Sequence, residues 1–437
     1  MNRYRQTLAS IDFPAFGAVL MLTIIGVMSV FSSNVNAEGV IVSTDYVRQI
    51  MWALIGLAVL LSLLGIDYRQ LKDYSPYFYL FLIVVLIYTR FFGKVVNGAR
   101  SWLGIGDLGV QPSEFMKLAV ILLLARYLDN SEHESDAVRI AKSLGIVMLP
   151  VALILLAPDL GSALVFFPIL FFMLIVAGIQ RRHLIFMVLV VASMVLFTIL
   201  PLWEKYILIR PTGFLLLFYQ SPYDFILLGL VIIIIALSLW GSISFKKPVY
   251  YWISYVSLAL GIGLALSIAA HKVLKEYQVM RLIVFLDPSI DPRGSGWNII
   301  QSITAIGSGG FAGRGFLAGP QSHNNYIPQQ STDFIFSIIA EEWGFLGGLV
   351  VFGLFWLLLH RCAAIMEAVR DRYATYIVAG VMGMVAFHFM INSGMAMGIM
   401  PITGIPLLFL SYGGSSLLTI MAAMGIVLGI SARRYHS

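Results

Sequence analysis

Long runs of apolar residues alternate with short polar connections along almost the whole chain. A helical run of about 17–25 apolar residues matches the hydrocarbon core of a bilayer. The chain does not show the ten-residue segments of alternating polarity that are typical of outer-membrane barrels. The pattern therefore predicts an all-α, polytopic integral membrane bundle of about 12 transmembrane helices. The predicted spans are residues 13–33, 50–66, 75–92, 113–128, 143–158, 161–180, 183–203, 222–244, 249–271, 334–359, 374–399 and 407–431.

Composition supports a membrane protein and narrows the classes of function. Of the 437 residues, 59% are hydrophobic and 11% are charged, whereas soluble domains average about a quarter charged residues. These figures exclude a cytosolic enzyme, a nucleic-acid-binding domain and a disordered scaffold. The net charge of +6 therefore does not point to a nucleic-acid partner. The single cysteine excludes a disulfide framework and a cysteine-based metal cluster.

Basic residues are distributed unevenly between the two sides of the predicted bundle. With the N-terminus in the cytoplasm, the cytoplasmic connections hold most of the Lys and Arg residues, among them Arg3, Arg5, Arg181 and Arg182. Because Lys and Arg collect in cytoplasmic loops, we expect both termini in the cytoplasm. The longest connection, residues 273–333, is then a large extracytoplasmic loop. Its apolar, glycine-rich composition predicts that it folds against the membrane and builds a site.

Ionisable residues at membrane depth are costly and by default mark function. The first such cluster joins Arg100 to the stretch that contains Pro112, Glu114 and Lys117. Proline and an acidic residue favour a helix start at this point, and Glu114 and Lys117 share one helix face because they are three residues apart. Two interpretations remain open. The two residues form a structural ion pair, or Arg100 and Lys117 hold a phosphate or pyrophosphate.

The second cluster lies at the predicted outer turn between the fifth and sixth spans. Asp159 follows Pro158 and precedes Leu160-Gly161-Ser162. Its carboxylate is suited to cap the following helix by accepting the first amide protons. A role in a ligand or cation site is the alternative.

The third cluster comprises the long loop and the helix that follows it. The glycine-rich stretch 307–319 is suited either to a flexible connection or to backbone contact with an anion. Asp333 then begins an apolar helix, as an N-cap or as a general base at the outer mouth of the bundle. Eight residues make about 2.2 helical turns, so we expect Glu341 to lie beneath Asp333, where it could help Asp333 hold a divalent cation. Glu342 would point away.

Together these clusters resemble the SEDS family (shape, elongation, division and sporulation), and specifically its RodA branch. Thr403 and the Ile-Gly-Ser-Gly-Gly of residues 306–310 favour the RodA branch over the division branch. The matching stretches are residues 97–102, 111–117, 158–163, 285–296, 301–310, 332–344 and 401–416.

The resemblance implies a peptidoglycan glycosyltransferase that polymerises lipid II at the outer face of the bacterial inner membrane during cell elongation. It implies a class B penicillin-binding protein as partner, in addition to membrane lipids. Asp333 matches the essential aspartate of the family and is the expected general base. Arg100 and Lys117 would bind the pyrophosphate of the substrate, together with Mg²⁺ or Mn²⁺ on unidentified ligands. Glu114, Asp159 and Glu341 complete the expected substrate site.

Two features depart from the family pattern. Asn325 and Gln329 carry amides where relatives often carry acidic residues. The family usually has ten spans, so residues 205–272 are expected to be an inserted helix pair within one SEDS-type domain of residues 1–437.

A lipid II flippase or another polytopic transporter is the main alternative, since many spans with intramembrane charge are also typical of transporters. A non-catalytic scaffold is the other. The predicted position of Arg100, Lys117, Asp159 and Asp333 on the outer side favours the enzyme, because a transporter needs a site near the midplane.

Overall fold

The computed structural model describes residues 11–96, 99–105, 108–207, 223–273, 276–292, 294–324 and 326–433. Within these residues, ten helices are long and apolar enough to cross a membrane. This confirms an all-α, multi-pass membrane protein. The chain divides into two compact units, residues 1–178 with 301–437 and residues 179–300.

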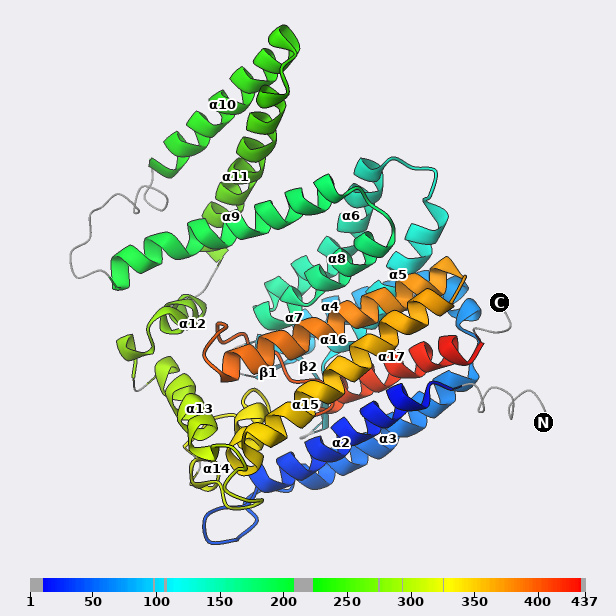
Figure 1. Cartoon of the computed structure of the whole chain (residues 1–437), viewed down its shortest axis with the longest axis vertical. Coiled ribbons are helices and arrows are strands. Elements are labelled where there is room, and N and C mark those ends of the chain that lie inside the picture. The colour runs from blue at the N-terminus through cyan, green and yellow to red at the C-terminus, as the bar shows by residue number, and fades with distance from the viewer. Residues whose placement is uncertain are drawn as a thin grey trace. The chain divides into compact units, whose positions relative to one another are not determined.

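The first unit is a bundle around a helix near the C-terminus (Figure 1). In it, α2 packs on α15, α3 packs on α17, and α16 contacts both α5 and α8. The innermost helix is α17, of which 94% of the apolar window is buried. Its helices are α2 (Phe13–Ser33), α3 (Asp45–Gly65), α4 (Tyr68–Phe92), α5 (Pro112–Asn130), α6 (Asp136–Leu156), α7 (Leu160–Leu164), α8 (Phe166–Val176), α14 (Pro320–His323), α15 (Ile335–Ala368), α16 (Arg372–Ala396) and α17 (Gly414–Arg433).

The second unit is built on a hairpin of two apolar helices packed on a third. In it α11 contacts both α9 and α10. The helix pair predicted within residues 205–272 falls largely on this hairpin, and residues 208–222 of that range lie outside the described residues. The elements are α9 (Arg181–Tyr206), α10 (Tyr223–Phe245), α11 (Pro248–Val273), α12 (Glu276–Leu286) and the 3₁₀ turn η2 (Pro288–Ile290), and α13 (Ser295–Gly309) continues into the first unit.

Helix caps of the first unit also tie distant helices together. Asp12 accepts the backbone amide of Ala15 at the start of α2 and also pairs with Arg361 of α15, whose Nη2 lies 2.5 Å from Oδ2. Asp371 caps α16 through the amide of Tyr373 and accepts the hydroxyl of Tyr68 at the start of α4. One carboxylate thus satisfies orphan amides of a helix start and sets the position of a neighbouring helix.

A small antiparallel sheet, which the hydrophobic pattern did not predict, connects α4 to α5. Its strands are β1 (Lys94–Val96), β2 (Ala99–Ile105) and β3 (Leu108–Val110), in the order β1-β2-β3. Arg100 lies on β2 and pairs in register with Val95. The sheet pairs backbone groups of the connection between α4 and α5 and brings the chain back to Pro112.

Two predicted spans differ from the observed helices. The expected span 161–180 is divided into α7 and α8, which meet at Val165. The expected span 407–431 is wrong at its start, because α17 begins only at Gly414. Residues 397–413 instead form an irregular connection in which Phe409 has a φ of +67°. Apolar composition alone cannot distinguish such a buried connection from a helix.

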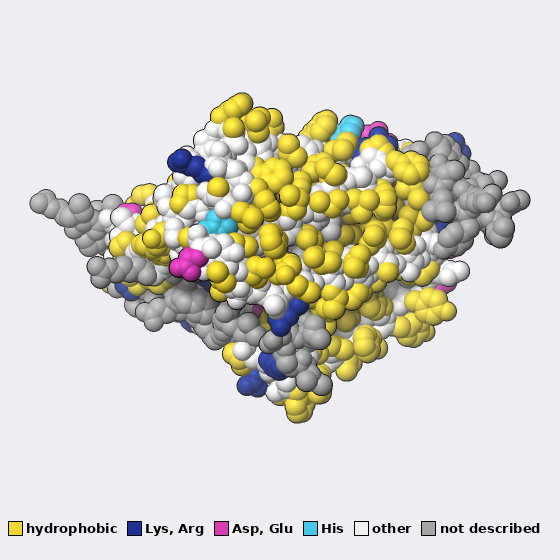
Figure 2. Space-filling model, turned by 90° about the horizontal axis from the view of Figure 1, so that it is seen from below, with side chains coloured by type: hydrophobic (Ala, Val, Ile, Leu, Met, Phe, Trp, Pro, Cys, Tyr) yellow, Lys and Arg dark blue, Asp and Glu magenta, His cyan; other side chains and the backbone are white. Residues whose placement is uncertain are grey.

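The predicted loop 273–333 is largely structured, since it contains α12, η2, α13 and α14. On one face of the molecule, hydrophobic side chains form a broad and nearly continuous surface on which the charged side chains are few and scattered (Figure 2). Such a surface suits a chain surrounded by lipid.

Candidate active site

Glu114 and Lys117 form a buried ion pair in the first turns of α5. The Lys117 Nζ lies 2.6 Å from the Glu114 Oε1, and the lysine is 1% exposed. The three-residue spacing therefore predicted their contact correctly. Because Lys117 is enclosed, it does not present its charge at the surface in this conformation.

His388 of α16 is the second partner of Lys117. Its Nε2 lies 3.3 Å from the Lys117 Nζ, and its Nδ1 lies 2.8 Å from the Pro406 carbonyl oxygen. A carbonyl only accepts, so Nδ1 carries the hydrogen and Nε2 is left to accept from the ammonium group. The neutral imidazole thus connects Lys117 to the 397–413 connection.

Asp159 caps α7, as its position after Pro158 predicted. It accepts the amide of Ser162 at 3.0 Å and the hydroxyl of Ser162 at 2.8 Å. It also accepts the side-chain amide of Gln111 at 2.8 Å. Gln111 immediately precedes α5, so this bond joins the second cluster of the sequence to the first.

Arg100 is exposed on the small sheet and donates to the carbonyl of Phe91 at the end of α4. Among the described residues, the structure shows no bond between Arg100 and Lys117. Its guanidinium holds the sheet against α4 and keeps further donors directed to solvent.

Asp333 is partly exposed and lies just before α15. The residue that caps this helix is Phe334, without a side-chain hydrogen bond, so the interpretation of Asp333 as an N-cap is wrong. The backbone of this segment is instead held by a side chain of α16. Asn392 of α16 donates through Nδ2 to the Asp333 carbonyl at 2.8 Å.

The 397–413 connection holds the residues around Asp333 in place. The hydroxyl of Ser411 donates to the Thr332 carbonyl at 2.5 Å, and the amide of Tyr412 donates to the Ser331 carbonyl at 2.8 Å. Gln49 of α3 donates to the Ser411 carbonyl at 3.2 Å. Irregular backbone at membrane depth is tolerated where it is buried in protein, and these bonds provide its partners.

Glu341 is fully buried and binds the start of α14 rather than Asp333. Its carboxylate accepts the amides of Gln321 at 2.8 Å and Ser322 at 3.0 Å, in addition to the Ser322 hydroxyl at 2.5 Å. The expectation that it lies beneath Asp333 was wrong in its premise, since the helix begins at Ile335 and does not include Asp333. Glu341 therefore anchors the loop that leads to Asp333.

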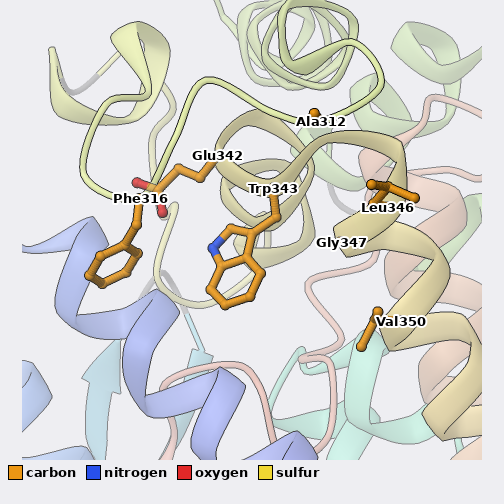
Figure 3. A pocket seen from close by; sticks show the side chains of 7 residues that line it. All are labelled: Ala312, Phe316, Glu342, Trp343, Leu346, Gly347 and Val350. Atoms are coloured by element: carbon orange, nitrogen blue, oxygen red, sulfur yellow. The ribbon is translucent and has the colours of Figure 1, made fainter.

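Glu342 anchors the same loop from the other side. Its Oε1 accepts the hydroxyl of Ser32 and lies 3.2 Å from the His323 Nε2. Beside it is a pocket of about 350 Å³, lined by residues of the glycine-rich loop and of α15. In Figure 3 the Glu342 carboxylate reaches toward the loop at Phe316, while Trp343 projects beside the Phe316 ring. The lining residues are Ala312, Phe316, Glu342, Trp343, Leu346, Gly347 and Val350.

The glycine-rich loop closes a break inside α15. Gly344 has a φ of +67° within this helix, a conformation that glycine adopts without strain. The freed carbonyls of Glu341 and Glu342 accept the amides of Arg314 and Gly315. The loop therefore supplies backbone partners to a broken membrane helix, a role that neither of the two sequence-based alternatives included.

Several polar residues at the centre were not identified from the sequence as part of the site. His388 and Asn392 are both fully buried, and they lie one turn apart on α16. The sequence feature that could have identified them is the same as for Glu114, namely a polar side chain inside an apolar helix. Gln49 carries the same signal in α3.

A metal centre built from protein side chains is not assembled within the described residues. No three His, Cys, Asp or Glu side chains among them converge as a metal site. Asn325 lies outside the described residues, whereas Gln329 precedes the Asp333 segment and accepts the Asp333 backbone amide through its carbonyl at 3.0 Å.

Comparisons with known proteins agree over nearly the full length. Peptidoglycan glycosyltransferase RodA of Treponema pallidum is 47% identical over 432 residues, which cover 97% of this chain and 98% of the relative. Stage V sporulation protein E of Bacillus subtilis is 32% identical, with 94% of each chain covered.

Solved structures share the fold. A chain of a peptidoglycan synthase complex that coordinates polymerization and crosslinking superposes with a TM-score of 0.67 at 27% identity, covering 98% of this chain and 99% of that chain. Rod shape determining protein RodA of Thermus thermophilus gives a TM-score of 0.60 at 24% identity, with 98% of each chain covered.

The sequence model of the FtsW, RodA and SpoVE cell cycle proteins matches residues 14–224 and 224–436. With nearly the whole chain matched, and with the RodA of Treponema pallidum 47% identical to it, the protein belongs to the FtsW, RodA and SpoVE family, which is the SEDS family.

Proposed function

We propose that this chain is a peptidoglycan glycosyltransferase of the RodA type, which polymerises lipid II into glycan strands during cell elongation. The observation that carries the proposal is the 47% identity, over nearly the whole of both chains, to a relative that bears this name. The site is consistent with it, because Asp333 and Lys117 are both held by one face of α16.

The reaction transfers a glycosyl group from one lipid-linked substrate to another. A sugar hydroxyl attacks the anomeric carbon of the donor, a new glycosidic bond forms, and the bond to the lipid pyrophosphate breaks. Attack on an α-linked donor by direct displacement produces a β-linkage. The hydroxyl proton has to leave as the bond forms, and the partly exposed Asp333 is suited to accept it as general base.

The leaving pyrophosphate accumulates negative charge. Arg100 is exposed and is suited to contact a phosphate group with the fixed geometry of its guanidinium. Lys117 is enclosed, so it acts on that charge through its field or after a rearrangement of the site. Glu114, Asp159 and Glu341 support the site through the bonds described above.

A divalent cation such as Mg²⁺ or Mn²⁺ stays a prediction. Two of the carboxylates that the sequence analysis assigned to the site, Asp159 and Glu341, already accept hydrogen bonds from amide and hydroxyl donors. They do not fit a ready cation site, and no step above passes through a metal ion.

The expected setting is the bacterial inner membrane, with both termini in the cytoplasm and the active site outside. The support is the charge distribution of the loops together with the ten apolar helices. A class B penicillin-binding protein is the proposed partner. One structural neighbour belongs to a synthase complex that coordinates polymerization and crosslinking, and a transpeptidase is the enzyme that supplies the second activity.

The test is polymerisation of purified lipid II by the full chain together with its class B penicillin-binding protein. Replacement of Asp333 by Asn keeps the size of the side chain and removes the base, so we expect a loss of at least about 10²-fold in rate. Glu38→Gln, which changes an exposed carboxylate in the connection between α2 and α3, is the control for a lost carboxylate. Elution volume, Tm and partner binding should be unchanged in both variants.

Retained polymerisation in Asp333→Asn would contradict the assignment of the base. Transport of labelled lipid II across vesicles by a wild-type chain that does not polymerise it would instead support the flippase.

A further inference from the structure

Two side chains on α16 connect groups that the proposed reaction needs but that lie far apart in sequence. His388 and Asn392 are four residues apart, hence on the same face of the helix. Both are 0% exposed. His388 accepts from the Lys117 ammonium group at 3.3 Å, and Asn392 donates to the Asp333 carbonyl at 2.8 Å.

The other bonds of these two residues converge on neighbouring peptide groups. His388 donates through Nδ1 to the Pro406 carbonyl at 2.8 Å, and Asn392 donates to the Ile405 carbonyl at 2.8 Å. Adjacent carbonyls of the 397–413 connection are thus held by adjacent turns of α16. Since these carbonyls belong to a non-helical segment, they have no helical partners of their own.

We infer that His388 and Asn392 are positioning residues for glycan polymerisation, His388 by holding the Lys117 ammonium group and Asn392 by holding the Asp333 backbone. The inference rests on the proposed function. Both side chains are fully buried, so neither is placed to touch substrate. They act by keeping the cation and the base in one geometry, and a displacement of about 1 Å in such groups can cost 10²-fold in rate.

The two ring nitrogens of His388 bond to different partners, so each contact can be removed without the other. Glutamine places an acceptor where Nε2 stands and loses the donor to Pro406, whereas asparagine keeps a donor near Nδ1 and loses the acceptor for Lys117. Each variant loses one buried hydrogen bond, so a purely structural role predicts similar losses of stability and activity in both. A role in holding Lys117 predicts that they differ.

The experiment measures kcat and KM for lipid II polymerisation by the full chain with its partner, in parallel with Tm. We expect His388→Asn to lower kcat at least about tenfold with KM within about twofold, and His388→Gln to stay within about threefold of wild type. Tyr79→Phe, which removes a partly buried 2.7 Å bond to the Ile146 carbonyl between α4 and α6, is the control for a lost hydrogen bond and should retain full activity.

Asn392→Leu tests the second contact. Leucine has the same number and branching of side-chain heavy atoms but no donor, and we expect kcat to fall at least about tenfold at a similar KM. Equal activity of the two His388 variants, or unchanged kcat in Asn392→Leu, would overturn the inference. If a variant does not fold, the amide exchange of residues 329–334 in Asn392→Ser decides, since only a positioning role predicts faster exchange there with α5 unchanged.

The outcome is independent of the base assignment. If Asp333→Asn retained activity while His388→Asn lost it and His388→Gln did not, the proposed base would fail and the role of His388 would stand. If the wild-type chain did not polymerise lipid II at all, the proposed function itself would fail.

Discussion

Two apolar helices of this protein occupy opposite environments. The helix α10 has the higher peak mean hydropathy, 2.7 against 1.9 for α17, yet only 11% of its apolar window is buried, compared with 94% for α17. In a soluble protein the more apolar helix would be expected in the core. In a bilayer the most apolar helix surfaces contact lipid. The helix buried among other helices can therefore contain small and polar residues.

The same contrast holds for the contacts that join helices. In the centre of the first unit they include a buried ion pair and bonds to irregular backbone, as at Lys117 and Asn392. In the second unit they include hydroxyl contacts, such as the 2.8 Å contact between Ser238 and Ser254. Hydroxyl contacts hold membrane helices together, whereas buried charge costs stability and marks function. The following variants test this division.

Loss of the Lys117 charge should have the largest effect. In Lys117→Met the carboxylate of Glu114 stays buried without its cation, and breaking a buried ion pair in this way costs about 3–5 kcal/mol. We expect a clear fall in Tm and loss of polymerisation, measured by thermal unfolding in detergent and by the lipid II assay.

A double variant separates the two interpretations of this pair. Glu114→Gln combined with Lys117→Met removes both charges and should recover most of the lost stability, while polymerisation stays low. Recovery of activity together with stability would show that the pair is only structural. The polar contacts at the centre of the first unit would then only hold helices together, like those of the second unit.

A close helix contact in the second unit gives an intermediate effect. A Cβ at Gly263 of α11 would lie 1.9 Å from the Ser193 Oγ of α9, so Gly263→Leu forces the two helices apart at a cost of about 1–3 kcal/mol. We expect hydrogen exchange of α9 and α11 to rise about tenfold or more while α5 is unchanged. Gly229→Leu on α10, where a Cβ meets nothing within 4 Å, is the matched control.

Exchange that rises equally in α5 and α9 would contradict the division of the chain into a polar centre and a hairpin held by small residues. If hydrogen exchange in Gly263→Leu rose in neither α9 nor α11, the two helices would accommodate the larger side chain without loss of stability.

The hydrophobic pattern predicted most of the fold because a membrane span is a local property of about twenty residues. Local spacing likewise predicted the Glu114–Lys117 contact and the cap at Asp159. It failed where contacts join distant segments. A lone His388 in an apolar helix signals that a partner exists, but not that this partner is Lys117, 271 residues earlier. The break at Gly344 was missed because its backbone partners come from another segment.

The smallest effect is expected at an exposed ion pair just beyond the other end of α5. Glu134 accepts from Lys142 Nζ at 2.6 Å and from the Tyr127 hydroxyl at 2.8 Å. These bonds, that to Lys142 first, lower the pKa of the Glu134 carboxyl below its ordinary value. A lowered pKa means that the stabilisation is present at neutral pH and is lost as the pH falls through the folded-state pKa. Glu134→Gln should therefore lower Tm by only about 1 °C at pH 7, and by nothing once the wild-type carboxyl is protonated. A loss at pH 7 as large as that of Lys117→Met would mean that burial does not determine what an ion pair contributes here, since Lys142 is 54% exposed and Lys117 is 1% exposed.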